Sequence, residues 1–216
     1  MSAESMGHEE APRVSSLTVC VEAYNEVTTL KAAVEDLLTT LRPLVKELDI
    51  VVVDDGSDDG TYEEAERLAE EHAEVRALHH ATNRGIGAAF HTGLAAARAE
   101  YYTDFPGDHE NPADEVKALI VHAAPGRIVT LDYQKNDSRP WLRRFLSHSY
   151  VALVNLMMGV HVRNFNGLSV FPTEALRKEE LQAEGFVYSS EALFLLLRRG
   201  LTQVDVEAKA RGRSSG

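Results

Sequence analysis

The sequence contains a single cysteine, Cys20, among its 216 residues. An internal disulfide is therefore excluded, and because Cys20 lies within an apolar strand pattern we interpret it as a small core residue and not as a nucleophile. Basic residues are also few, since 22 Lys and Arg stand against 34 Asp and Glu, for a formal net charge of −12. This balance disfavours a general nucleic-acid binder, which would present a basic face to phosphates.

Long apolar runs are missing as well. The most apolar stretch of the second half, residues 150–160, is too short to cross a bilayer and is interrupted by Asn155. The start of the chain is polar and acidic, which predicts a disordered lead-in over residues 1–15 and not a signal peptide. We therefore expect a cytoplasmic protein that would meet a lipid only peripherally, at the membrane surface.

Residues 16–216 have a suitable length for one α/β domain, and they contain no repeat or low-complexity tract. Apolar runs alternate with helical stripes, a rhythm typical of a parallel sheet flanked by helices. The pattern predicts strands at 17–22, 50–53, 75–79, 101–105 and 127–130, and helices at 27–48, 61–72 and 86–99. Pro43 is a point at which the first helix ends or kinks. Farther along, the pattern predicts a long helix through 158, short strands near 162 and at 168–171, and a helix at 191–199.

Polar residues follow directly after the first two predicted strands. The first strand runs into Glu22-Ala23-Tyr24-Asn25-Glu26, and the second into Val53-Asp54-Asp55-Gly56-Ser57. Ligands of open α/β sheets bind at the carboxyl ends of the strands, so these two turns form a candidate site. The alternative is a plain strand-to-helix connection in which Ser57 or Asp58 caps the next helix.

Together with a third segment, Asn83-Arg84-Gly85-Ile86-Gly87-Ala88-Ala89, these motifs resemble those of the family-2 glycosyltransferases. The family motifs read Pro-Ala-Tyr-Asn-Glu, Val-Asp-Asp-Gly-Ser and Asn-Arg-Gly-Lys-Gly-x-Ala. Within the family, the chain looks most like the polyprenyl-phosphate sugar synthases, such as the dolichyl-phosphate mannose synthases. The resemblance runs from about residue 16 to the last residue. It implies the GT-A fold, an α/β domain with a mostly parallel central sheet flanked by helices.

The resemblance also implies a donor nucleotide site built from the three motifs, with Tyr24, Asn25, Glu26, Asp55, Gly56, Asn83, Arg84 and Gly85. A carboxylate accepts hydrogen bonds from a base or ribose, a tyrosine offers an apolar face, and a guanidinium complements phosphate oxygens. Asn83 has an alternative role as a loop and capping residue. Gly85 and Gly87 indicate a helix start that is approached closely by a ligand or a strand, but a short Gly-x-Gly is weak evidence alone.

The family places an Asp-x-Asp motif after the fourth strand, where a divalent cation meets the donor diphosphate. Here Pro106 replaces the first aspartate, Asp108 keeps the second, and Glu110 restores the number of carboxylates. We expect Asp108 and Glu110 to be catalytic and to hold Mg²⁺ or Mn²⁺, with Asp108 also contacting the donor. His109 is expected to face away, and Asp104 is a weaker alternative ligand. A degenerate or metal-independent site remains open.

The second half of the chain supplies residues for the acceptor or its phosphate. Its basic segment contains Arg139, Arg143 and Arg144, which suit a phosphorylated acceptor or the leaving diphosphate, or else form a solvated helix face. Glu191 is either an acceptor-site residue or a helix-start charge. The tail resembles an Arg-x-x-Gly-x-Ser segment that the family uses near the phosphates, which implies a catalytic role for Arg211 and phosphate contact for Ser214; the alternative is a plain basic tail.

The resemblance implies an inverting glycosyltransferase that moves a sugar from a UDP-, GDP- or TDP-sugar to an acceptor. A polyprenyl phosphate at the membrane surface is one acceptor, since the basic segment suits a phosphate. A sugar or natural-product hydroxyl stays open, and it would require a carboxylate as general base. A catalytically degenerate nucleotide-sugar-binding protein of the same fold is the other alternative. Nucleic acid is not an expected partner, and the sequence does not indicate the oligomeric state.

Overall fold

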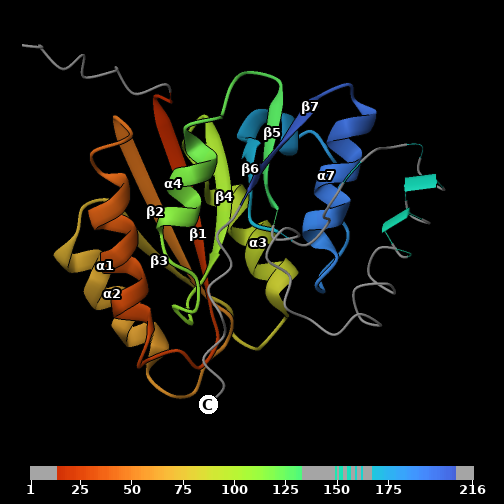
Figure 1. Ribbon diagram of the computed structural model, residues 1–216. Helices are drawn as coiled ribbons and strands as arrows, with labels where there is room; N and C mark the ends of the chain where they lie inside the picture. Colours follow the sequence, from red (N-terminus) through yellow and green to blue (C-terminus); the bar gives the residue numbers. More distant parts are fainter. Residues whose placement is uncertain are drawn as a thin grey trace, which may run out of the picture.

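The computed structural model describes residues 14–132, 149, 151–152, 155–156, 159, 162 and 167–207, which form a sheet with helices on both faces (Figure 1). The described strands are β1 (Ser16–Ala23), β2 (Glu47–Asp54), β3 (Val75–His79), β4 (Tyr101–Pro106), β5 (Arg127–Asp132), β6 (Ser169–Pro172) and β7 (Thr202–Glu207). The described helices are α1 (Leu30–Leu41), α2 (Thr61–Glu71), α3 (Ile86–Ala96), α4 (Asp114–Ile120), α6 (Thr173–Leu176) and α7 (Tyr188–Arg198). The predicted α/β class is confirmed.

The order of the strands places the ends of β1, β2 and β4 side by side. The sheet runs β3-β2-β1-β4-β6-β5-β7, and among the described strands β6 runs antiparallel to its neighbours β4 and β5. β1 pairs in parallel with β2 and with β4, so Glu22 lies between Val53 on one side and Pro106 on the other. Parallel strands end at the same edge, and the predicted polar turns therefore meet there.

Alternation along the strands separates two apolar layers, one on each face of the sheet. Val19 and Val21 of β1 belong to the layer under α1, α2 and α4, whereas Cys20 packs in the layer with Phe90 of α3 and Leu193 of α7. Cys20 is fully buried, which confirms its core role, and burial raises the pKa of its thiol well above the usual value. The sulfur is therefore neutral and packed, unlike a reactive thiolate.

The first helix is shorter than predicted. Its apolar stripe continues beyond Leu41 to Leu44 and Leu48, but Pro43 follows the last helical turn, and residues 47 and 48 already belong to β2. The prediction of a helix over 27–48 was therefore wrong at both ends. A proline cannot donate a backbone hydrogen bond, which is why the chain leaves the helix here.

Several other boundaries differ from the predictions. The helix predicted at 191–199 begins at Tyr188, and α4, α6 and β7 were not predicted. Val162 belongs to no strand; its backbone N–H and carbonyl both bond the side-chain amide of Asn155, at 3.0 and 2.8 Å. The predicted long helix through residue 158 lies mostly outside the described residues.

The packed fold begins before the predicted boundary at residue 16. Val14 is buried, and the Ser15 carbonyl accepts hydrogen bonds from the backbone N–H groups of Lys46 and Glu47, both at 3.1 Å. The lead-in predicted for residues 1–15 therefore includes two residues of the folded part, and residues 1–13 lie outside the description. In the described part of the chain, no helix combines the length and the apolar character needed to cross a membrane.

Candidate functional site

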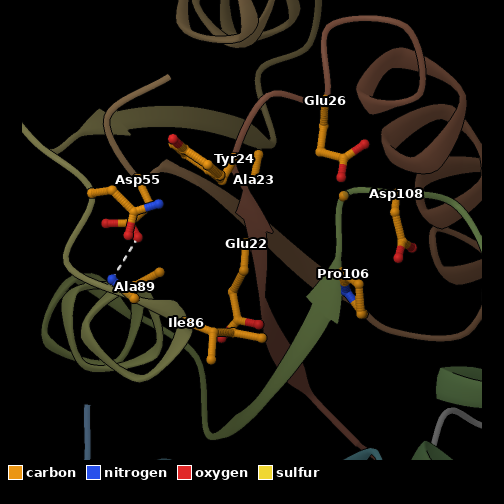
Figure 2. Close-up of a pocket in the computed structure, with 12 residues that line it drawn as sticks. Glu22, Ala23, Tyr24, Glu26, Asp55, Ile86, Ala89, Pro106 and Asp108 are labelled. Carbon is orange, nitrogen blue, oxygen red and sulfur yellow. Dashed lines mark hydrogen bonds between the residues drawn. The ribbon is translucent and has the colours of Figure 1, made fainter. Parts of the chain in front are cut away.

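A cleft of about 260 Å³ opens at the carboxyl ends of β1, β2 and β4 (Figure 2). It draws on all three sequence motifs and on the loop after β4, and it is lined by Glu22, Ala23, Tyr24, Glu26, Asp55, Asn83, Gly85, Ile86, Ala89, Pro106, Gly107 and Asp108. Most of the predicted donor residues therefore line one cleft. The exceptions are Asn25, Gly56 and Arg84, which contribute to the surrounding turns.

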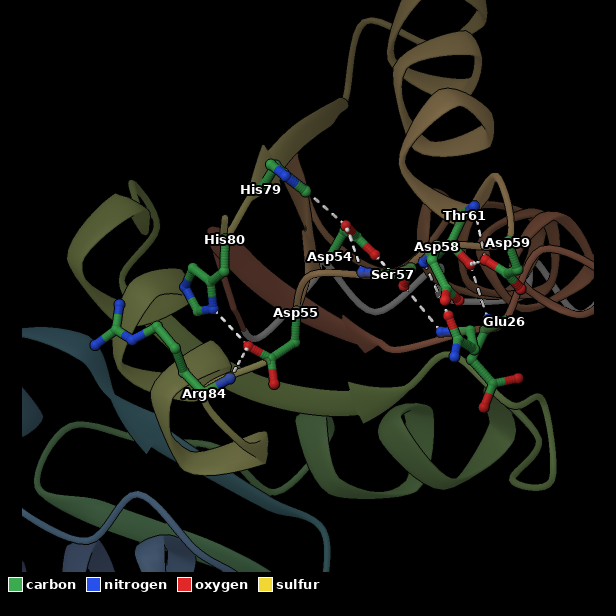
Figure 3. Close-up of polar contacts among 11 residues, drawn as sticks. Glu26, Asp54, Asp55, Ser57, Asp58, Asp59, Thr61, His79, His80 and Arg84 are labelled. Atoms are coloured by element: carbon green, nitrogen blue, oxygen red, sulfur yellow. Dashed lines mark hydrogen bonds and ion pairs between the residues drawn. The ribbon is translucent and has the colours of Figure 1, made fainter. Parts of the chain in front are cut away.

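Asp55 joins the turn after β2 to the loop before α3 (Figure 3). Its buried carboxylate accepts the backbone N–H groups of Arg84 and Gly85, at 2.9 and 2.7 Å, and lies 2.6 Å from Nδ1 of His80. His80 in turn reaches the Thr92 hydroxyl at 2.8 Å. Asp55 was predicted to accept a hydrogen bond from the base or ribose, and this network shows that its oxygens already hold the loop before α3 in place.

Asn25 ties the turn after β1 to the turn after β2. Its backbone N–H donates to the Ser57 hydroxyl at 2.9 Å, and its side-chain oxygen accepts the N–H of Asp58 at 3.2 Å. Ser57 in turn donates to Asp54. At the start of α2 the N-cap residue is Gly60, so neither Ser57 nor Asp58 fills the predicted capping role. Asp59, just before the cap, accepts the N–H of Thr61 at 3.0 Å.

Two glycines of the motifs allow close backbone approaches. A Cβ on Gly56, whose φ is +77°, would lie 2.5 Å from the carbonyl carbon of Thr82. A Cβ on Gly87 would lie 2.5 Å from the carbonyl oxygen of Ala183, and the Gly87 N–H donates to the Glu184 carbonyl at 2.9 Å. A close approach by a ligand or a strand was predicted at the start of α3; in the structure it is the 183–184 loop, and not a strand, that approaches.

Replacing Gly56 by alanine is expected to cost about 1–3 kcal/mol more than replacing Gly60 by alanine. Both glycines have positive φ angles, but at Gly60 the nearest atom to an added Cβ is a Val27 methyl at 3.7 Å, whereas at Gly56 it is backbone. Comparing the two variants therefore separates the cost of steric overlap, expected only at Gly56, from the cost of a left-handed backbone conformation, expected at both positions. Urea denaturation of both variants measures the difference, and equal costs would show that the two turns are not in contact.

Arg84 presents its guanidinium to solvent at the rim of the cleft. The side chain is 53% exposed, with Nη2 4.0 Å from the Glu184 carboxylate, and Figure 3 shows it extending away from Asp55. Glu191 lies in the first turn of α7, which matches the predicted alternative of a helix-start charge. Its carboxylate accepts the N–H groups of Gln182 and Ala183, at 3.0 and 2.9 Å, from the first turn of α7. It thereby holds the loop that contacts α3.

The segment after β4 separates the predicted metal ligands. Asp108 lines the cleft and accepts the N–H of Glu110 at 2.9 Å, whereas Glu110 is exposed and does not line it. His109 faces α1, with Nε2 3.6 Å from Asp36, which confirms that it points away. Asp104 is buried and accepts the Tyr188 hydroxyl at 2.7 Å, outside the cleft lining. No group of three His, Cys, Asp or Glu among the described residues is arranged to hold a metal ion.

Glu22 is a site residue that the sequence analysis did not identify. It lines the cleft, is 7% exposed, and neither carboxylate oxygen has a hydrogen-bond partner among the described residues. Burial, and then the nearby carboxylates Asp104 and Asp55, raise the pKa of Glu22 well above its usual value. The available signal was its position in the first motif, where the family has proline.

Five further predicted site residues lie outside the described residues: Arg139, Arg143, Arg144, Arg211 and Ser214.

Solved structures share this architecture. Glucosyl-3-phosphoglycerate synthase from Mycobacterium tuberculosis, in complex with UDP, aligns with a TM-score of 0.69 at 21% identity, covering 100% of this chain and 79% of that one. Structures of the same synthase also contain Mn²⁺ with UDP-glucose, or Mg²⁺ with UDP. At this level of identity the likeness shows the fold, and it confirms the predicted GT-A architecture.

The sequence model described as glycosyl transferase family 2 matches residues 18–186, and the chain belongs to this family. Dolichol-phosphate mannosyltransferase from Saccharomyces cerevisiae is 26% identical over 190 residues, which are 82% of this chain and 69% of the yeast protein. An undecaprenyl-phosphate 4-deoxy-4-formamido-L-arabinose transferase from Proteus mirabilis is 25% identical over 150 residues, 68% of this chain. The chain spans only 45% of that Proteus protein.

Proposed function

We propose that this chain transfers a sugar from a nucleoside diphosphate sugar to an acceptor oxygen, with inversion at the anomeric carbon. The acceptor oxygen forms its bond to that carbon as the bond to the diphosphate breaks, and the diphosphate leaves with the electron pair. The observation that carries the proposal is the single cleft that unites the three donor motifs with Asp108. Family membership supports the reaction class.

The nucleotide is proposed to lie between the turns after β1 and β2 and the loop before α3. Tyr24 is 47% exposed at this end of the cleft and offers a ring face to the base. Gly85 and Asn83 line the same end, and the exposed guanidinium of Arg84 is available for phosphate. A UDP-sugar is the first donor to test because the aligned synthase structures contain UDP, followed by GDP- and TDP-sugars.

We propose that the cleft takes a divalent cation, although no three acidic or histidine side chains of the described residues are already arranged around one. Four carboxylates line it, from Glu22, Glu26, Asp55 and Asp108, and oxygen ligands of this kind are those that Mg²⁺ and Mn²⁺ prefer. A bound cation would stabilise the charge that develops on the departing diphosphate. Of the two predicted ligands, Asp108 lines the cleft and is proposed to hold the cation, whereas Glu110 would have to enter the cleft from the exposed loop.

The proposed acceptor is a polyprenyl phosphate met at the membrane surface. Relatives in yeast and in Micrococcus luteus are named for dolichol-phosphate and undecaprenyl-phosphate mannosyl transfer. A lipid phosphate is already anionic near neutral pH and needs no protein base. Arg139, Arg143 and Arg144 are proposed to bind this phosphate, Arg211 and Ser214 to approach the donor diphosphate, and Glu191 to support the acceptor side.

The test is calorimetric titration of the chain with UDP-, GDP- and TDP-sugars, first with Mn²⁺ and then with EDTA. We expect one nucleotide to bind more tightly with Mn²⁺, because the lining of the cleft is acidic. Donor binding that is equally tight with Mn²⁺ and with EDTA would instead indicate that arginine side chains bind the diphosphate. If none of the donors binds, the proposed function is wrong.

Replacement of the first aspartate by Pro106 favours a second candidate, a nucleotide-sugar-binding protein without transfer activity. Binding that is followed by no transfer to any acceptor would support it. The Pro106→Asp variant separates the two: it should gain transfer activity if the native site is degenerate, whereas an adapted enzyme is active without it.

A further inference from the structure

We propose that Glu22 supplies the carboxylate that position 106 lacks, so that Glu22 and Asp108 together hold the divalent cation. The inference rests on the proposed function, since the cation serves the donor diphosphate. It assigns to this chain a metal site with one ligand on β1 and the other in the loop after β4, instead of two ligands on one Asp-x-Asp loop.

The pairing of β1 with β4 places Glu22 beside position 106. Glu22 and Pro106 are Cα partners in the parallel pairing of β1 with β4, and the Gly107 N–H donates to the Glu22 carbonyl at 2.8 Å. Paired residues on neighbouring strands point to the same face of a sheet, about 4.8 Å apart. The Glu22 carboxylate therefore lies on the same face of the sheet as the carboxylate that an aspartate at position 106 would have. Glutamate is one methylene longer than aspartate, so its carboxylate reaches farther from the strand. Figure 2 shows Glu22, Pro106 and Asp108 at this end of the sheet.

The two positions have exchanged residue types relative to the family motifs. The first motif has proline where this chain has Glu22, and the Asp-x-Asp motif has aspartate where this chain has Pro106. The exchange conserves both the acidic group and the proline at the junction of β1 and β4. A single loss at position 106 would not explain why an acidic residue stands on the paired position.

The Glu22 carboxylate is buried without a hydrogen-bond partner among the described residues. Glu22 is 7% exposed, it lines the cleft, and both of its oxygens lack a hydrogen-bond partner within the described part of the chain. Buried carboxylates are normally paired or bound to metal, because burial without a partner is costly. The Tyr188 hydroxyl beside it donates to Asp104 at 2.7 Å and leaves Glu22 without that bond. Glu22 is therefore an available oxygen ligand aimed into the site.

Unlike Glu22, the other acidic residues of the cleft accept hydrogen bonds. Asp55 accepts three from its neighbours. Glu26 accepts the Thr29 hydroxyl at 2.7 Å, and Asp108 accepts the Glu110 N–H at 2.9 Å. None of the described residues that line the cleft is basic. An anionic diphosphate would therefore enter a negative environment unless a cation were bound there. Glu22 and Asp108 both line the cleft in which that cation is needed.

The test measures Mn²⁺ binding by electron paramagnetic resonance on the full chain, with and without UDP, and needs no acceptor. Glu22→Gln is expected to lower the Mn²⁺ affinity at least about 10-fold. The variant has the same shape and removes no hydrogen bond, so the fold is retained, as circular dichroism would check. Glu35→Gln, which changes an exposed residue of α1, is the matched control. Glu110→Gln tests the competing ligand: a loss of Mn²⁺ affinity in Glu110→Gln but not in Glu22→Gln would assign the site to Glu110 and overturn the inference.

A rescue experiment completes the test. Pro106→Asp introduced into Glu22→Gln is expected to restore Mn²⁺ affinity, because the carboxylate returns to the same space from the paired strand. Unchanged Mn²⁺ affinity in Glu22→Gln, with UDP still bound, would overturn this inference and leave the proposed function standing. If the unaltered chain binds neither Mn²⁺ nor UDP, both are overturned.

Discussion

Replacing Asp108 by asparagine is expected to lower the rate of sugar transfer about 10²–10³-fold. Asparagine keeps an oxygen that accepts the Glu110 N–H, now bonded at 2.9 Å, so the loop after β4 retains its conformation. What is lost is the negative charge, and with it a ligand of the proposed cation beside the leaving diphosphate. The effect should therefore fall on catalysis and metal affinity, and not on stability.

The measurement is release of nucleoside diphosphate from the donor that calorimetry identifies, with polyprenyl phosphate in vesicles as acceptor. The matched control is Asp114→Asn at the start of α4, whose side chain is 76% exposed and pairs only at the surface with Lys117. Transfer by Asp108→Asn at the rate of this control would rule out a metal role for Asp108. Recovery of activity at high Mn²⁺ would show that the loss lies in metal affinity.

The central strands were predictable because each is a short, continuous apolar run that ends in polar residues. β3 was predicted with the bounds that it has, Val75–His79, and β2 was found from its buried run. The edge strand β7 was missed because its residues are half-buried or exposed and mix polar with apolar types, without a core signal. The seven-residue helix α4 was missed because it is too short to show a clear helical period.

The site was predictable in outline and not in its contacts. The three motifs were read locally, and the parallel sheet brings them to one cleft, as the rule for strand ends requires. Glu22 could be recognised as a candidate ligand only from its pairing with Pro106 on the neighbouring strand. The two residues are 84 positions apart in the sequence, so no local pattern contains this pairing. The partners of Asp55 lie 25 to 30 residues farther along the chain, so its engagement by His80 and Gly85 could not be inferred from spacing.

The engagement of Asp55 leads to the largest expected change in stability. Asp55→Ala should lower the free energy of unfolding by about 3–5 kcal/mol, as expected when one partner of a buried, hydrogen-bonded pair is removed. The side chains of Asp55 and His80 are each 6% exposed, and the N–H groups of Arg84 and Gly85 would lose their acceptor. Nucleotide binding should weaken as well, because the loop before α3 would no longer be held.

Urea denaturation of Asp55→Ala beside Asp58→Ala measures this expectation. Asp58 lies in the same turn and is exposed, and its backbone N–H, which bonds Asn25 at 3.2 Å, survives the substitution. His80→Ala completes a double-mutant cycle, in which the coupling between positions 55 and 80 should exceed about 1 kcal/mol because the two groups are in direct contact. Additive losses would show that Asp55 stabilises the loop through Arg84 and Gly85 alone. A cost for Asp55→Ala no larger than for Asp58→Ala would contradict the buried network itself, and with it the explanation of how the loop before α3 is positioned.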